Sequence, residues 1–349
     1  MNEGLKLTAW FGERERIGSR FLADALIDAC ERHAVRASCL LRGVEGFGAK
    51  HRLQSERLLS LSEDLPLAAV AVDAPARIEA LLADVAGLQR GGLVTLERVA
   101  LLGGDALPAA DAGEAKLTVH LGRGQRAAGG APAYRAVVAA LHDAGVAGAS
   151  VLLGVDGTAH GERRRARFLA RNAEVPLMVV SVGEPGRLAT ALERIAALVP
   201  AAPLATLERV EVLKRDGVRL ASPSPLADAD AAGRPLWRML SVYASEQSRH
   251  RGATLHTTLV RRLRAEGAAG ATALRGIWGY HGDHEPHGDR LWSVRRRVPV
   301  VTVVLDRPQA ADRWLGLIDE LTDETGLVTS EIVPALRDGP GDAPPLAQP

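Results

Sequence analysis

The sequence lacks the features that mark several large classes of protein. It has only two cysteines, Cys30 and Cys39, among 349 residues, whereas a small secreted disulfide scaffold carries more. We therefore expect two buried thiols in a reduced, cytoplasmic protein. The chain also has no run of about 18 apolar residues and no basic-then-apolar N-terminal segment. These absences predict neither a membrane-spanning helix nor a secretion signal.

Charge of one sign is also not in excess. The 43 Lys and Arg residues are balanced by 42 Asp and Glu residues, for a net charge of +1. This balance gives no general electrostatic reason to bind nucleic acid or an anionic membrane. Two short basic runs, residues 163–165 and 295–297, are typical of a solvated surface. We predict no nucleic-acid partner and no membrane insertion.

Catalytic motifs are missing as well. The sequence contains no GxSxG elbow, no HExxH pair and no Cys–His arrangement suited to nucleophilic catalysis. It has no GxxxxGK[ST] phosphate loop either. We therefore predict that the protein is not an enzyme, and nucleotide binding finds no support in a motif.

What the chain does have is a stretch that occurs three times. An apolar strand pattern runs into a glycine turn at residues 40–48, and again at residues 152–157 and 273–280. Other markers recur in the same order at intervals of about 110 to 120 residues, such as Thr95 and Thr206 in a closing strand. The chain is therefore predicted to consist of three tandem units.

Each unit shows the same succession of patterns, β-α-β-β-α-β, which predicts an α+β fold of ferredoxin-like units. Ala-, Pro-, Asp- and Gly-rich segments separate the units. The predicted division is unit one at residues 1–104, a linker at 105–115, a degenerate unit two at 116–215, a linker at 216–236, unit three at 237–337 and a disordered tail at 338–349.

The third strand of each unit is apolar on both faces. These strands are residues 67–72, 177–182 and 300–305, whereas a lone antiparallel sheet with helices on one face should alternate apolar and polar residues. We predict that the second faces meet at a closed three-fold core, so that the chain is a monomeric, intramolecular pseudo-trimer. The alternative is three separate units in a row, which would expose three apolar sheets.

Several segments resemble a known family. They are Lys6-Leu7-Thr8, the RGVEGFG of residues 42–48, the SEDLP of 62–66 and the GLVT of 92–95, with further likeness at 275–290 and 327–331. These segments resemble the bacterial PII-like family catalogued as domain of unknown function 190. Unit two departs from the pattern, because Leu153 replaces the arginine and Thr158 the aromatic residue.

The resemblance implies a trimeric assembly of ferredoxin-like units. It further implies a regulatory protein that binds a small ligand, often an adenine nucleotide, in clefts between subunits. A loop between the second and third strands would report to a partner, and a link of the family with fluoride exporters points to a membrane transporter. In a fused chain, assembly no longer depends on concentration. The other interpretations are a metal-binding protein and a structural adaptor without a ligand.

The glycine turns of units one and three are the predicted ligand sites. Arginine and backbone N–H groups there are suited to a phosphate or carboxylate, and glycine allows its close approach. The predicted residues are Arg42, Gly43, Glu45, Gly46, Phe47, Gly48 and His51 of unit one, and Arg275, Gly276, Trp278, Gly279 and Tyr280 of unit three. Alternatively, the arginines pair with a carboxylate such as Glu45, and the aromatic rings belong to the core.

Unit three also carries a histidine-rich loop. His281, His284 and His287 recur at every third position among acidic residues, and such side chains can bind a divalent metal. Gly282 and Pro286 predict a loop rather than a helix, so the spacing does not place the three rings on one face. A solvated, pH-responsive loop is the alternative.

Overall fold

The computed structural model describes residues 2–48, 51–55, 64–88, 91–102, 113–165, 175–200, 203–282, 285–288, 298–322 and 326–337. The helical piece predicted near residues 57–59 and the predicted tail lie outside this part of the chain. Along the described residues, no helix is long and apolar enough to cross a membrane.

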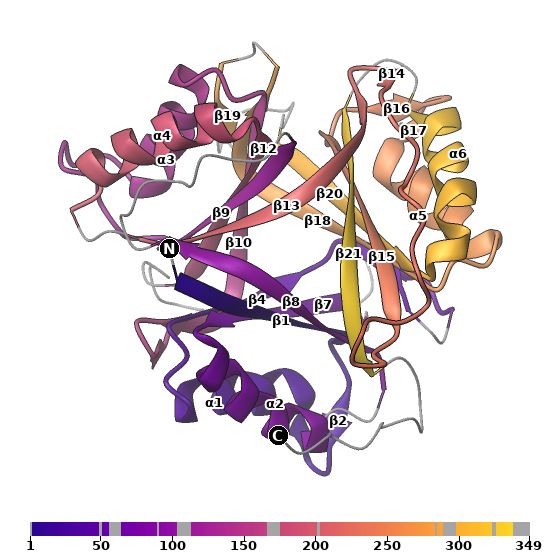
Figure 1. Cartoon of the computed structure of the whole chain (residues 1–349), viewed down its shortest axis with the longest axis horizontal. Coiled ribbons are helices and arrows are strands. Elements are labelled where there is room, and N and C mark those ends of the chain that lie inside the picture. The colour runs from indigo at the N-terminus through magenta and orange to yellow at the C-terminus, as the bar shows by residue number, and fades with distance from the viewer. Residues whose placement is uncertain are drawn as a thin grey trace.

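Each unit folds into a four-stranded antiparallel sheet with two helices, and the helices lie on its outer face (Figure 1). Unit one orders its strands β8–β1–β7–β4. Unit two repeats the order as β13–β9–β12–β10, and unit three as β21–β15–β20–β18. The prediction of an α+β fold built from three tandem repeats is therefore confirmed.

The main elements of unit one are β1 (Asn2–Gly12), α1 (Leu22–Arg32), β4 (Ala37–Arg42), β7 (Pro66–Asp73), α2 (Pro75–Leu88) and β8 (Leu93–Leu102). Those of unit two are β9 (Glu114–Gly122), α3 (Ala133–Asp143), β10 (Gly148–Ala159), β12 (Pro176–Gly183), α4 (Pro185–Leu198) and β13 (Leu204–Arg215). Those of unit three are β15 (Leu236–Ser245), α5 (Leu255–Ala265), β18 (Gly270–His281), β20 (Pro299–Asp306), α6 (Ala311–Leu321) and β21 (Leu327–Arg337).

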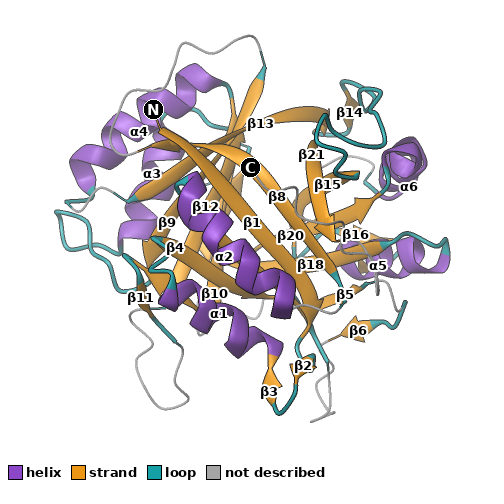
Figure 2. Ribbon diagram, turned by 60° about the horizontal axis from the view of Figure 1, so that its bottom comes forward, coloured by secondary structure: helices purple, strands orange, loops and turns teal. Residues whose placement is uncertain are grey.

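Shorter elements lie in the connections. They are β2 (Arg16–Ile17), β3 (Arg20–Phe21), β5 (Glu45–Phe47), β6 (Gln54–Ser55), β11 (Glu162–Arg163), β14 (Val218–Arg219), β16 (Arg249–His250), β17 (Ala253–Thr254), β19 (His287–Gly288) and the 3₁₀ turn η1 (Pro308–Ala310). In Figure 2, α1 and α2 lie across the outer face of the sheet that contains β1 and β4.

The turn interpretation expected each glycine stretch to end the second strand. This holds in unit one, where β4 ends at Arg42, but it is wrong for units two and three. In units two and three the strand continues through the glycine stretch, and its far end pairs with the neighbouring unit. The end of β10 pairs with β4 of unit one, and the end of β18 pairs with the start of β10. In unit one, the separate strand β5 pairs with the start of β18. The three units are thus joined in a ring along one edge of each sheet.

Glycine makes these joins possible because its backbone can approach a neighbouring strand closely. A Cβ atom on Gly157 would lie 2.1 Å from the carbonyl oxygen of Ser38, and one on Gly279 would lie 2.2 Å from that of Ala149. The repeated glycines therefore serve strand pairing between units. At the opposite edges β8, β13 and β21 also pair with one another in a ring.

The apolar faces of the three sheets meet in one shared core. Its buried residues come from every unit and include Val70, Met178 and Val303 of the doubly apolar strands β7, β12 and β20. Each unit has in addition its own core between sheet and helices. Both faces of these strands are therefore covered, which explains why the sequence does not alternate there.

Candidate functional site

The aromatic residues of the glycine stretches lie inside neighbouring units. Phe47 of unit one is 2% exposed and packs into the core of unit three. Tyr280 of unit three is 4% exposed, packs into the core of unit two, and donates a hydrogen bond from its hydroxyl to the Val146 carbonyl oxygen at 2.7 Å. Trp278 packs against the same core. The guanidinium carbon of Arg135 lies over its ring, 4.2 Å from the ring centroid. These rings are therefore part of the joins between units.

Most of the glycines predicted as ligand-binding residues also lie in close contacts at these joins. A Cβ atom on Gly43 would lie 2.7 Å from Pro66, one on Gly46 2.6 Å from the Ala271 carbonyl oxygen, and one on Gly276 2.8 Å from Pro299. Gly48 has open space around it. His51 stacks on Phe47 with ring centroids 5.9 Å apart.

The two arginines predicted to clamp a ligand each form an ion pair. The Arg42 guanidinium lies 2.9 Å from a carboxylate oxygen of Glu13, and Arg275 lies 3.0 Å from one of Glu246. The carboxylate suggested as a partner of Arg42, Glu45, is buried and lies 3.3 Å from Arg261 of unit three instead. A ligand at either glycine stretch would have to displace an existing partner.

The histidine-rich loop is only partly within the described residues, because His284 lies outside them. His281 pairs with Asp216 at 2.8 Å, and His287 donates from Nδ1 to the Glu285 carbonyl oxygen at 2.7 Å. His281 and His287 thus each have a partner of their own. Metal binding by this loop stays a prediction.

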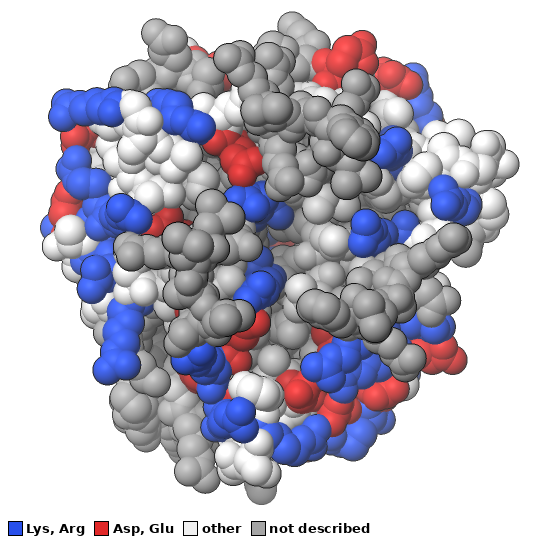
Figure 3. Space-filling model, turned by 180° about the vertical axis from the view of Figure 1, so that it is seen from behind, with Lys and Arg blue, Asp and Glu red and all other residues white. Residues whose placement is uncertain are grey.

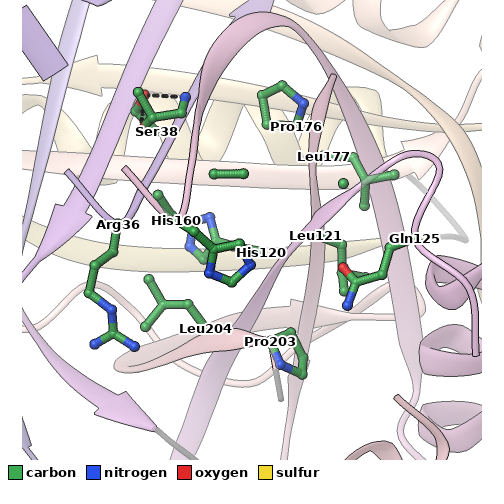
Figure 4. A pocket seen from close by; sticks show the side chains of 14 residues that line it. Arg36, Ser38, His120, Leu121, Gln125, His160, Pro176, Leu177, Pro203 and Leu204 are labelled. Carbon is green, nitrogen blue, oxygen red and sulfur yellow. Dashed lines mark hydrogen bonds between the residues drawn. The ribbon is translucent and has the colours of Figure 1, made fainter. Parts of the chain in front are cut away.

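A pocket opens where unit two joins unit one (Figure 4). Its cavity volume is about 60 Å³. Its polar lining is Arg36, Ser38, His120, Gln125, Thr158 and His160. Thr158 stands at the position that Phe47 and Tyr280 occupy in the other two joins. The sequence pointed first to clefts between units one and three, and it marked Thr158 only as a departure from the pattern.

Hydrogen bonds hold this third join where the other two use aromatic packing. The Thr158 hydroxyl donates to the Val35 carbonyl oxygen at 2.8 Å and lies 2.9 Å from the Ser38 hydroxyl. The Ser38 hydroxyl also accepts from the backbone N–H of Thr158 at 2.8 Å. A polar wall of defined geometry therefore lines one side of the pocket.

The pocket combines the guanidinium of Arg36 and several hydrogen-bonding side chains with an apolar remainder that includes Leu121, Leu177 and Leu204. No Asp or Glu is among its lining residues, and in the described part of the chain no carboxylate forms an ion pair with Arg36. Burial lowers the pKa of His120 to about 4, so its ring is neutral at pH 7, and its Nε2 atom is buried without a hydrogen-bond partner. Such a set of groups favours an anion over a cation.

A further inter-unit contact contradicts the interpretation of Arg163 as part of a solvated basic run, although Arg164 and Arg165 beside it are more exposed. The Arg163 side chain is only 17% exposed and forms ion pairs with Asp156 of its own unit and with Asp24 and Asp28 on α1 of unit one. Elsewhere charges of both signs are interspersed, as the face in Figure 3 shows. No pattern in the sequence indicates this contact, because two of the acidic partners lie in another unit.

Comparison with known proteins identifies the repeats. The model of the PII-like family of domain of unknown function 190 (DUF190), described as an uncharacterized ACR, matches residues 4–101, 114–212 and 237–335. The chain belongs to this family. The resemblance inferred from the repeated segments is therefore confirmed, and the DUF190 chain carries three copies of the family's domain.

The chain is also similar to a curated relative and to a solved structure. A UPF0166 protein of Aquifex aeolicus (strain VF5) is 30% identical over 96 residues, which are 90% of that protein and 28% of the DUF190 chain. One unit thus corresponds to nearly a whole relative. The crystal structure of aspartate kinase from Synechocystis aligns with 97% of the chain and 46% of the kinase chain, at 11% identity and a TM-score of 0.28. That likeness is too low to inform fold or function.

Proposed function

We propose that this DUF190 protein is a non-enzymatic regulator of PII-like type that binds a small anionic ligand between units one and two. The carrying observation is the pocket that contains Arg36, His120 and His160 but no carboxylate. A phosphate or carboxylate group is the ligand chemistry that matches these donors. An adenine nucleotide is the ligand class that the family resemblance suggests.

The position of the pocket supports a regulatory role. Its walls come from β4 and the segment before it in unit one, and from β9, β10, β12 and β13 in unit two. A ligand there would contact both sides of the join between units one and two, where β4 pairs with β10. Binding would therefore favour one arrangement of this join over another, which is the requirement for a ligand to signal to a partner protein.

We further propose that the chain is a pseudo-trimer of ferredoxin-like units. The strand order repeated in each unit, the two rings of pairing between units and the shared core support this assembly. Fusion allows the three joins to differ. Aromatic rings fill two of them, and the third, with Thr158, has the pocket.

Arg36→Ala should weaken binding of an anionic ligand about 10- to 100-fold, because a charge-assisted hydrogen bond contributes roughly 1.5–3 kcal/mol. The measurement is calorimetric titration with inorganic phosphate, AMP, ADP, ATP and a tricarboxylate. Arg42→Ala is the matched control, since Arg42 is paired with Glu13. If Arg42→Ala or Arg275→Ala abolished binding and Arg36→Ala did not, the ligand would bind at the glycine stretches. The absence of any binding would contradict the proposed function.

The assembly predicts the mass in solution. A chain whose three units close on one another should run as a compact monomer of 36.9 kDa. Light scattering coupled to size-exclusion chromatography measures this directly. A mass of about three chains would mean that the units assemble with copies from other chains, and it would rule out the pseudo-trimer.

A further inference from the structure

Five ionisable side chains from all three units meet in the interior of the molecule. Lys6 on β1 lies 2.8 Å from Glu97 on β8 and also forms an ion pair with Glu208 on β13. Lys116 on β9 lies 3.1 Å from Glu208 and also forms an ion pair with Glu331 on β21. Oxygens of the three carboxylates lie within 4.8 Å of one another. We call these five residues the axial cluster.

The axial cluster is a three-fold arrangement with one member missing. The strand register pairs Lys6 with Glu97, Lys116 with Glu208, and Met239 with Glu331. Each lysine contacts the glutamate of its own unit and that of the next. A lysine at position 239 would by this rule contact Glu331 and Glu97, so these two carboxylates have one ammonium each and Glu208 has two.

The cluster therefore has three carboxylates for two ammonium groups, away from water. Unmet hydrogen-bonding capacity remains in the cluster. The Oε1 atoms of Glu331 and Glu208 are both buried without a hydrogen-bond partner. An uncompensated buried charge is costly, so a positive charge is expected there.

We propose that the Glu97–Glu331 pair holds one proton that takes the place of the missing lysine ammonium. One carboxylate takes a proton from solvent and becomes a neutral carboxyl group, and the axial cluster becomes electrically balanced. Loss of this proton would return an unpaired negative charge to the point where the three units meet. The axis is thereby a pH-responsive element at a place distinct from the pocket between units one and two.

The surrounding groups agree with this assignment. Burial and repulsion from Glu208 raise the pKa of Glu97, against the effect of Lys6. Burial opposes ionisation of Glu208, but Lys116 and Lys6 hold its pKa at about 2. Burial raises the pKa of nearby Tyr243 to about 12, so this residue is a neutral neighbour. His120, four residues after Lys116 on β9, is neutral at pH 7 as well.

The proposed proton stabilises the folded protein more at low pH than at high pH. A carboxyl group whose pKa is raised on folding stabilises the protein fully below its unfolded value, near 4.5, and this contribution is lost as the pH rises through the folded pKa. His120 and His256, whose pKa values burial lowers to about 4, change stability in the opposite direction. The test therefore compares variants with the wild type at each pH, so that the histidine contribution cancels.

The decisive variant is Met239→Lys, which supplies the third ammonium at a position whose equivalents in units one and two already accommodate lysine. Its melting temperature should exceed that of the wild type by a few degrees at about pH 8, and this gain should shrink toward about pH 5. In Glu97→Gln the side-chain amide cannot ionise. This variant should therefore not be destabilised, as the wild type is, when the pH rises. Infrared difference spectra should show a protonated carboxyl band in the wild type near pH 7 that Met239→Lys removes.

The control is Glu208→Gln, the same chemical change on the carboxylate that both lysines contact. It should lower the melting temperature at both pH values. The proposal fails if Glu97→Gln destabilises as much as Glu208→Gln, or if Met239→Lys folds without changing the pH dependence relative to wild type. Stabilisation of the wild type by sodium or potassium over choline at equal ionic strength would also overturn it, because the missing charge would then be a metal cation.

Discussion

Replacing Lys116 by methionine should lower the free energy of unfolding by about 3–5 kcal/mol, because removal of one partner from a buried ion pair leaves an uncompensated charge. The variant would give unit two the residue that unit three carries at position 239. Glu331 would lose its only ammonium and Glu208 one of two. Urea unfolding at about pH 8 measures the loss.

The loss should depend on pH. Burial alone would lower the pKa of Lys116, but Glu208 and Glu331 outweigh it and raise this pKa well above 10.5. The stabilising contribution of the lysine is therefore fully present below pH 10.5 and is lost only above it. In the variant, the two carboxylates can be neutralised by protons at acidic pH. The difference from wild type should thus be smaller near pH 4 than near pH 8.

Lys214→Met provides a matched comparison. Lys214 is as buried as Lys116, and its ammonium lies 3.2 Å from Asp319. The Asp319 side chain is 24% exposed, so water can solvate that carboxylate once the lysine is gone. The control should lose less stability than Lys116→Met. Equal losses would mean that the axial cluster contributes no more than an ion pair near the surface.

The repeat and its strands could be predicted from the sequence because their signals are local. Apolar runs, glycines and helix-opening prolines indicate each element within a few residues of where it lies. The apolar second faces of β7, β12 and β20 even required a partner surface, and the shared core supplies it. These inferences needed no knowledge of which distant segments meet.

The meaning of the glycine stretches could not be predicted in the same way. Glycines followed by an aromatic residue are compatible with a ligand cradle and with a close strand pair. Only the position of the neighbouring strand distinguishes them, and for Gly46 that neighbour is Ala271, in another unit. The axial cluster and the pocket at Arg36 were missed for the same reason. Each is assembled from residues whose separate patterns look like ordinary strand or loop positions.

Phe47→Ala tests whether the glycine stretch is mainly a join between units. The ring is 2% exposed and lies among core residues of unit three, including Leu259 and Trp314. Its removal should lower the free energy of unfolding by about 3–5 kcal/mol, as is typical when a buried aromatic side chain is truncated to alanine. Leu198→Ala, at a residue that is 38% exposed on α4, should cost far less.

A more specific test of Phe47→Ala is which unit loses local stability. Phe47 belongs to unit one in sequence, but its contacts are in unit three. Hydrogen exchange in Phe47→Ala should therefore accelerate at the amides of α5, which packs against β5, before it accelerates at α1 or α2. Faster exchange confined to unit one would mean that the ring stabilises its own unit. The glycine stretch would then be free to serve a ligand, and the case for Arg42 as a ligand-binding residue would be restored.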